Sequence, residues 1–204
     1  MKNILYLASK SPSRQYLLRE SKIPFTLLGQ NADEAQCDWS LSLEEVVTSI
    51  ARYKMSCTVM PQGKEGDVAF VLTADTLTQD KQGVVHGKPE DAADAIKKIE
   101  ALRGEARVAT AFCLDKKVFK NGSWDMVARK EQCVVSRCDF DVPDAWLERY
   151  FKESVIGFEA AGGMATEAYG MQFLRTIQGS YSGVIGLPLF EVREALDALD
   201  FFDA

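Results

Sequence analysis

The chain has 204 residues, of which 47% are hydrophobic and 26% are charged, and its formal net charge is -6. This length is ample for a buried core, and the composition is that of an ordinary soluble globular protein. The acidic balance argues against a broad surface for nucleic acid or for anionic membranes. An anionic small molecule can still bind wherever cations cluster locally.

Two further classes are disfavoured by the sequence. No apolar stretch approaches the roughly 18–20 residues that a membrane-spanning helix needs, and residues 1–8 form too short an apolar run for a secretory signal. We therefore expect a cytoplasmic protein with no membrane partner. The odd number of cysteines, without CxxC spacing, favours buried free thiols over a disulfide or a zinc site. They are Cys37, Cys57, Cys113, Cys133 and Cys138.

The first third of the chain predicts two strands and two helices. They are strands at 3–8 and 23–28 and helices at 12–21 and 42–60. Ser11 can cap the first helix, and Pro12 suits its first position because the missing N–H would have no partner there. Ser42, followed three residues later by Glu45, is a capping-box pattern that opens the second helix.

The rest of the chain predicts a buried strand, a hairpin, more helices and a glycine-rich region. In order these are strands at 68–74 and near 84–87, a helix at 92–102, strands at 108–114 and 126–140, a helix from Pro143, the glycine-rich stretch 157–186 and a helix from Pro188. Asn121-Gly122 is a hairpin turn signal. Together the elements predict a mixed α/β sheet flanked by helices, in a single domain over 1–204 without a separable linker.

The start of the first helix is a candidate anion site. Its free N–H groups and its dipole attract negative charge. Ser9, Ser11, Ser13 and Arg14 place hydroxyl donors and a guanidinium around the same point. This is how a protein would hold a phosphate, although a purely structural helix cap explains the pattern about as well.

Polar residues follow three of the predicted strands, where ligands gather in open α/β sheets. Ser9 follows the first strand, Asp75 and Thr76 follow 68–74, and Lys88 follows 84–87. A carboxylate such as Asp75 at a strand tip can bind a metal, orient water or accept a proton. The alternative is that Asp75 caps a turn.

His86, Lys54 and Lys88 limit the kinds of catalytic site that the sequence can form. His86 is the single histidine, so Ser–His catalysis and metal sites with two histidines are excluded. For Lys54, on the second helix, a solvated side chain is the default interpretation. Lys88 precedes a helix start, where the dipole disfavours a cation, so a compensating anion is expected beside it.

Taken in order, these pieces resemble the Maf family of nucleoside triphosphate pyrophosphatases over residues 4–196. The opening LASKSPSR at 7–14 is similar to the LAS-x-SPRR of that family. The other matching pieces are Asp33-Glu34 for the DE pair, Lys54, ADT at 74–76, GKP at 87–89, and GSYSGVIGLP at 179–188 for GSYSNVVGLP. The ordered set is far more specific than any one member.

The resemblance implies a two-lobed mixed α/β fold, related to inosine triphosphate pyrophosphatases, with a cleft between the lobes. It implies hydrolysis of a nucleoside triphosphate to a monophosphate and pyrophosphate with the help of Mg²⁺ or Mn²⁺. The ADT form, as opposed to SDQ, resembles the branch that acts on dTTP, UTP and related nucleotides. A modified nucleotide remains an alternative substrate, and a homodimer remains an open option.

The resemblance also assigns roles to individual residues. Asp75, Lys54 and Lys88 form the implied catalytic set, with Asp75 as candidate base for the attacking water. Glu34 and Asp75 would bind the metal. The implied substrate-binding residues are Ser9, Ser11, Arg14, Thr76 and Glu167.

Several positions depart from the family pattern. Ser13 stands where the family has the first arginine of SPRR, Ala160 where it has a lysine, and Glu167 where it has a glutamine. Arg107 lies nearest the position of a family histidine, and Gly183 replaces an asparagine. A carboxylate near a triphosphate would repel it unless protonated or bound to metal. The second hypothesis is therefore a weakly active or inactive relative that binds a nucleotide or a partner in cell division.

Overall fold

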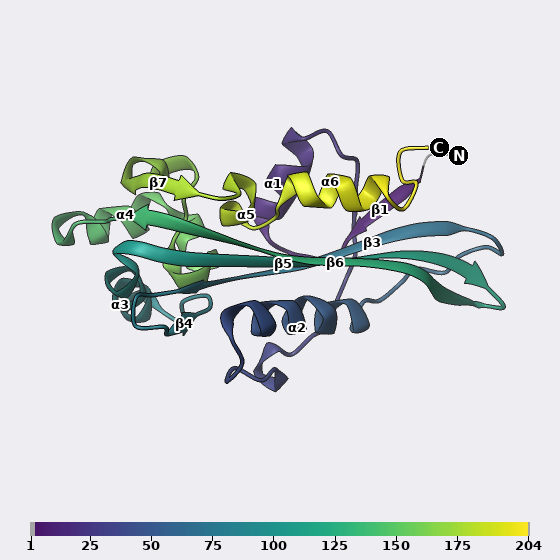
Figure 1. Ribbon diagram of the computed structural model, residues 1–204, viewed down its shortest axis with the longest axis horizontal. Coiled ribbons are helices and arrows are strands. Elements are labelled where there is room, and N and C mark those ends of the chain that lie inside the picture. Colours follow the sequence, from purple (N-terminus) through teal and green to yellow (C-terminus); the bar gives the residue numbers. More distant parts are fainter. Residues whose placement is uncertain (1–2, 204) are drawn as a thin grey trace.

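The computed structural model describes residues 3–203, in which a central sheet carries helices on both faces (Figure 1). The strands are β1 (Ile4–Leu7), β2 (Thr26–Leu27), β3 (Val68–Gln79), β4 (Val85–His86), β5 (Gly104–Lys120), β6 (Ser123–Phe140) and β7 (Leu174–Gln178). The α-helices are α1 (Pro12–Glu20), α2 (Leu43–Ser56), α3 (Ala92–Leu102), α4 (Leu147–Glu153), α5 (Tyr181–Ile185) and α6 (Leu189–Asp197). Short 3₁₀ turns are η1 (Glu34–Gln36), η2 (Asp144–Trp146), η3 (Val155–Glu159), η4 (Ala161–Gly163) and η5 (Ala168–Phe173). None of the described helices is long and apolar enough to cross a membrane.

The predicted mixed sheet is confirmed. Its strand order is β2-β1-β3-β5-β6-β7, and β4 pairs additionally with β3. β1 runs parallel to β2 and β3, whereas the pairs from β3 to β7 are antiparallel. The long β5–β6 hairpin turns at Asn121-Gly122, where both residues have positive φ (51° and 83°), as a type I′ turn requires.

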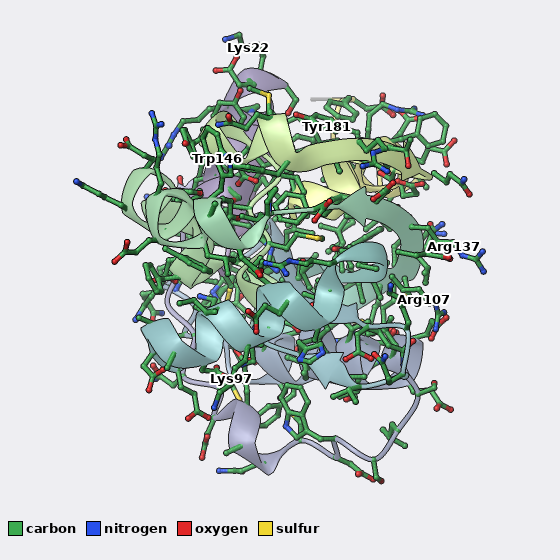
Figure 2. The ribbon with its side chains drawn as sticks, turned by 90° about the vertical axis from the view of Figure 1, so that its left-hand side faces the viewer. Lys22, Lys97, Arg107, Arg137, Trp146 and Tyr181 are labelled. Carbon is green, nitrogen blue, oxygen red and sulfur yellow. The ribbon has the colours of Figure 1, made fainter. Side chains whose placement is uncertain are left out.

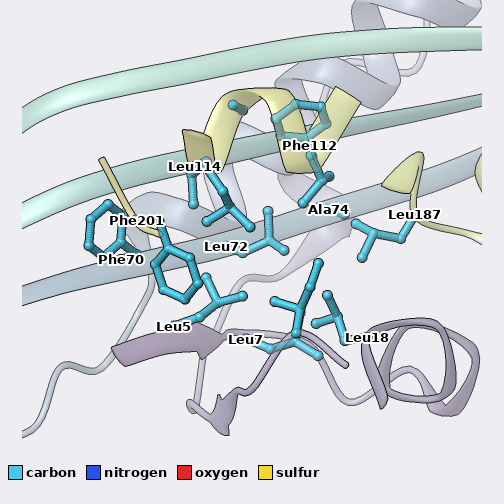
Figure 3. Packing of buried hydrophobic residues seen from close by; sticks show 14 of the residues in the cluster. Leu5, Leu7, Leu18, Phe70, Leu72, Ala74, Phe112, Leu114, Leu187 and Phe201 are labelled. Carbon is cyan, nitrogen blue, oxygen red and sulfur yellow. The ribbon is translucent and has the colours of Figure 1, made fainter. Parts of the chain in front are cut away.

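Alternating side chains of β3 sort the core onto the two faces of the sheet. Phe70, Leu72 and Ala74 face α1 and α6 in the largest apolar cluster (Figure 3). Val71 and Leu77 belong to the clusters on the opposite face, which are built with side chains of α2. Because a strand alternates with period two, Asp75 shares the α2 face and Thr76 the α1 face.

A separate apolar cluster forms one end of the molecule. It packs α3 and α4 against the adjoining ends of β5 and β6 and against the turns of 155–173. Tyr150 is its largest fully buried side chain, and its hydroxyl donates to the carbonyl of Gly163 at 2.8 Å. This end, seen on the left of Figure 1, is the second lobe.

The predicted position of Asp75 at a strand tip is wrong. β3 does not stop at Ala74 but continues to Gln79, because β5 pairs with it along its whole length. The strand that ends here is its neighbour β1, which pairs with β3 only as far as Leu72. On that same edge β4 pairs with β3 from Thr78. Asp75 therefore lies in the middle of β3, in an edge gap between two neighbouring strands.

Other element boundaries also differ from prediction. The expected strand at 23–28 is reduced to the two residues of β2, and α2 ends at Ser56 although its capping box is formed as predicted. The region 157–186 holds three 3₁₀ segments, β7 and α5, which no periodicity indicated. All five cysteines are free thiols as predicted, but only Cys113 and Cys138 are buried, and the other three are partly exposed.

Candidate functional site

A cleft of about 610 Å³ lies over the edge gap of β3. Residues 75–78 of β3 line its floor, the start of α1 lines one side, and the segment 159–167 of the second lobe lines another. Because neither β1 nor β4 covers this part of the edge, side chains from both faces of β3 reach the same cavity. The gap thus explains how Asp75 and Thr76 can serve one site despite pointing to opposite faces.

The cleft brings together all the site residues that the sequence singled out. Its lining includes Ser9, Ser11, Arg14, Glu34, Lys54, Asp75, Thr76, Lys88 and Glu167. These residues come from α1 and the turn before it, η1, α2, β3, the loop after β4 and the second lobe. Residues far apart in the sequence therefore share one cavity, and their individual contacts determine the chemistry available to each.

Lys54 is buried, contrary to the default expectation of a solvated side chain. It occupies the apolar stripe of α2 that faces the sheet, one turn after Ile50. Its Nζ lies 2.5 Å from Asp75 Oδ1 and 2.8 Å from Glu34 Oε1. One ammonium group therefore bridges the two carboxylates that the resemblance assigns to metal.

Asp75 keeps one oxygen without a partner. Its Oδ2 is buried and accepts no hydrogen bond within the described residues. Burial raises the pKa of this carboxyl above its usual range, and the charges of Lys54 and Arg14 oppose that shift. A carboxylate oxygen that is desolvated and unpaired is suited to accept a proton from water or to ligate a cation.

The carboxylates of Asp75 and Glu34 fit a hard divalent cation whose remaining ligands are water or phosphate oxygens. Asp75 Oδ2 is an orphaned buried oxygen, and Glu34 adds a second carboxylate at the same ammonium. Within residues 3–203 no cluster of three or more His, Cys, Asp or Glu side chains is arranged to hold a metal ion. Mg²⁺ is commonly held by one or two carboxylates together with substrate phosphates and water, which is the set available here.

All three nitrogens of the Arg14 guanidinium donate hydrogen bonds to oxygens of the protein. Its guanidinium donates to Gly186 O at 2.8 Å, to Ser9 Oγ at 3.1 Å and to Thr76 Oγ1 at 3.1 Å. These bonds join α1 to the end of β1, to β3 and to the closing segment. Arg14 thus shapes the α1 side of the cleft and orients two of the predicted ligand hydroxyls.

Replacing Arg14 with Lys should therefore destabilise the protein. A lysine keeps the charge but cannot reproduce three diverging bonds, and the loss of buried hydrogen bonds costs about 2 kcal/mol. We expect a melting temperature lower by roughly 4–8 °C in a thermal-shift assay. The matched control is Arg19→Lys on the same helix, where the exposed side chain donates one hydrogen bond, to Gln15, and lies over the ring of Phe25. Equal melting temperatures for wild type and Arg14→Lys would contradict this role.

Two departures from the family pattern contact each other. Ser13 Oγ donates to Glu167 Oε1 at 2.6 Å, across 154 positions of sequence. Glu167 is half-buried, and burial raises the pKa of its carboxyl while the bond from Ser13 lowers it. The cleft therefore holds a hydrogen-bonded Ser13–Glu167 pair at two positions where the family pattern has an arginine and a glutamine.

The remaining cations of the cleft differ in their partners. The expected anion beside Lys88 is Glu159, whose Oε2 lies 2.7 Å from Lys88 Nζ in an exposed pair. Lys98 pairs with Asp94. In the described part of the chain, Lys10 has no carboxylate within ion-pair distance and its side chain makes no hydrogen bond, although it lines the cleft at the start of α1. It is the lining cation that can meet an anion without breaking an existing contact.

Arg107 and His86, which were also considered from the sequence, lie outside the cleft lining. Arg107 pairs with Glu44 and with Gln79, and it faces Arg137 across the β5–β6 ladder (Figure 2). His86 Nε2 lies 2.8 Å from Asp80 Oδ2 in the turn between β3 and β4. Arg107 therefore links β5 to β3 and α2, and His86 links β4 to the turn before it.

Sequence reasoning missed two classes of lining residue. Lys10 occupies the variable position of the opening motif, so its free ammonium could have been suspected from its place between Ser9 and Ser11. Trp39 and Gln30 also line the cleft, but they come from irregular loops with no periodic signal. Only the folded chain brings them to the site.

The fold and the cleft define an α/β protein whose ligand site combines a helix start, a lysine-bridged carboxylate pair and a second-lobe wall. The model of the Maf-like protein family matches residues 4–199, and the chain belongs to this family. A protein of Ralstonia nicotianae called dTTP/UTP pyrophosphatase is 35% identical over 94% of this chain and 92% of its own length. Proteins of the same name from Xanthomonas euvesicatoria and Pelodictyon phaeoclathratiforme are 34% and 32% identical, each over 96% of this chain and 98% and 97% of their own lengths.

Proposed function

We propose that this protein hydrolyses a pyrimidine nucleoside triphosphate of the dTTP or UTP kind between the α and β phosphates, releasing pyrophosphate. The names of its relatives support the reaction and the substrate class. The observation that carries the proposal is the cleft floor, where Lys54 bridges Glu34 and Asp75 while Asp75 Oδ2 stays unpaired.

The proposed roles follow from the contacts. Asp75 Oδ2 accepts a proton from the attacking water, whose oxygen bonds to phosphorus as the bridging P–O bond breaks. Lys54 and Lys88 stabilise negative charge on the phosphates. Ser9, Ser11 and the N–H groups that open α1 bind phosphate oxygens, and Arg14 holds Ser9 and Thr76 in place.

A divalent cation, Mg²⁺ or Mn²⁺, belongs to the same proposal. Glu34 and Asp75 would hold it, and it would neutralise phosphate charge when bound with the nucleotide. Because the protein offers two carboxylates, the phosphates must complete the ligand set. We therefore expect weak cation binding without nucleotide and stronger binding with it.

The decisive experiment is a panel of canonical and modified nucleoside triphosphates with Mg²⁺ or Mn²⁺, read by pyrophosphate release. Turnover of dTTP or UTP above the purine nucleotides supports the proposal and its substrate class. Silence across the panel favours the second candidate, a nucleotide-binding relative with little or no activity. The Glu167 carboxyl favours the second candidate, because it adds negative charge where phosphates would bind.

Glu167→Gln should separate these candidates further. Removing a nearby like charge is worth about 1 kcal/mol through water, so kcat/KM for the triphosphate should rise roughly fivefold. Because burial raises the pKa of Glu167, its carboxyl is more protonated at low pH, and the gain over wild type should shrink from pH 8 to pH 6. Glu153→Gln, at the exposed end of α4, is the control and should change neither value. A gain that grows toward low pH would contradict this explanation.

A further inference from the structure

The cleft contains a single aromatic side chain among its described lining residues, and the proposed chemistry leaves it unused. Trp39 follows η1 in the loop before α2, and its residue surface is 42% exposed although it is one of the largest apolar side chains of the chain. A large exposed ring beside a ligand cavity is a natural contact for a flat apolar group.

The ring is held in place from two sides. Trp39 Nε1 donates to the backbone carbonyl of Glu34 at 3.3 Å. Its Cη2 also lies next to Gly87, where an added Cβ would be 3.6 Å away. Trp39 therefore spans from the turn that carries Glu34 to the loop that carries Lys88.

This position suits the base of a nucleotide whose phosphates are cleaved at Asp75. A short chain of contacts links the ring to that carboxylate: Trp39 to Glu34, Glu34 to Lys54, and Lys54 to Asp75. In a nucleotide one ribose separates the base from the α-phosphate. With the α-phosphate at Asp75, the outer phosphates can extend toward α1 and the base toward Trp39.

The other apolar groups of the cleft offer a poorer platform. Val108, Met164, Val184 and Ile185 line it, but each is at least nine-tenths buried. They are also aliphatic, so they lack the flat face on which a base stacks. Trp39 is the lining residue that combines a π-face with exposure.

We propose that Trp39 binds the nucleobase by stacking, with η1 and Gly87 holding the ring in position. This inference rests on the proposed function for the placement of the phosphates. Stacking on an aromatic ring tolerates any base, so Trp39 supplies affinity for nucleotides over inorganic polyphosphates. Discrimination among bases must come from other groups.

The test compares two ligands that differ in the base. The probes are the α,β-methylene analogue of UTP and inorganic triphosphate, each with Mg²⁺, titrated into wild type, Trp39→Leu and Trp39→Phe. We expect Trp39→Leu to weaken the analogue roughly tenfold and to leave inorganic triphosphate unchanged. Trp39→Phe keeps a ring and should retain most of the affinity.

Intrinsic fluorescence provides a second readout. The other two tryptophans, Trp124 and Trp146, do not line the cleft. The analogue should therefore quench wild-type emission, and Trp39→Phe should abolish the quench. Equal weakening of both ligands in Trp39→Leu, or no weakening of either, would overturn the stacking role. If wild type binds neither probe and releases no pyrophosphate from nucleotides, the proposed function fails first and the inference fails with it.

Discussion

Replacing Asp75 with Asn is expected to lower kcat for nucleoside triphosphate hydrolysis by roughly 10³-fold. The amide replaces the unpaired, basic oxygen Asp75 Oδ2 and removes the charge that would hold a cation. It keeps an oxygen able to accept from Lys54, whose Nζ lies 2.5 Å from Oδ1 in the native protein. The variant should therefore fold. Pyrophosphate release and a melting curve measured on the same preparation check both statements.

Asp115→Asn is the matched control. Asp115 is a fully buried aspartate on β5, next to β3, and it does not line the cleft. It accepts two bonds from Arg129, at 2.6 and 2.9 Å. Its replacement should lower the melting temperature while leaving kcat/KM of the folded fraction near the wild-type value. Wild-type turnover in Asp75→Asn would rule out the proposed base.

Local sequence signals predicted most of the fold because short-range physics decides those elements. The capping box of α2 and the Asn121-Gly122 turn are written in adjacent residues, and both occur as predicted. The end of β3 was misjudged for the opposite reason. Pairing with β5, about 30 positions away, carries the strand past Asp75, and the polar residues that interrupt its apolar run do so because this stretch faces a cleft.

The sequence motifs predicted residues that line the cleft, but they did not predict the contacts between those residues. Nothing local indicates that Lys54 is buried against Asp75 or that Ser13 bonds to Glu167. Such pairings depend on where α2 and the second lobe settle on the sheet. Trp39 shows the limit most clearly, since its loop carries no periodic pattern at all.

Except for Lys10, the cations of the cleft already have protein partners before any ligand enters. Lys54 contacts two carboxylates, Lys88 contacts Glu159, and Arg14 donates to three neutral oxygens. A triphosphate that binds Lys54 or Lys88 must therefore draw the lysine away from its carboxylate partners, and those carboxylates then need a new counter-charge. A divalent cation that arrives with the nucleotide would meet that need.

Lys54→Met tests whether a divalent cation can replace the Lys54 ammonium as the counter-charge of Glu34 and Asp75. It removes the ammonium between Glu34 and Asp75 and leaves two facing carboxylates. Breaking a buried ion pair costs about 3 kcal/mol or more, although Glu34 is partly exposed and its share is screened by solvent. We expect a melting temperature lower by roughly 6–12 °C at pH 8 and loss of turnover.

The pH dependence of that loss has a definite sign. Burial raises the pKa of Asp75 and Lys54 opposes the rise, so the pKa should climb further in the variant. A raised pKa means that ionisation disfavours the folded state, and the penalty appears as pH rises from the unfolded value near 4 through the folded one. The stability gap between wild type and Lys54→Met should accordingly be smallest at pH 5 and largest at pH 8.

Mn²⁺ should then stabilise Lys54→Met more than wild type, because the cation can occupy the charge vacancy between the two carboxylates without competing with an ammonium. Lys116→Met is the control, since Lys116 pairs with Asp200 outside the cleft at 3.0 Å. It should respond to Mn²⁺ as wild type does. A melting-temperature gain from Mn²⁺ that is equal in all three proteins would show that Glu34 and Asp75 do not form a cation site.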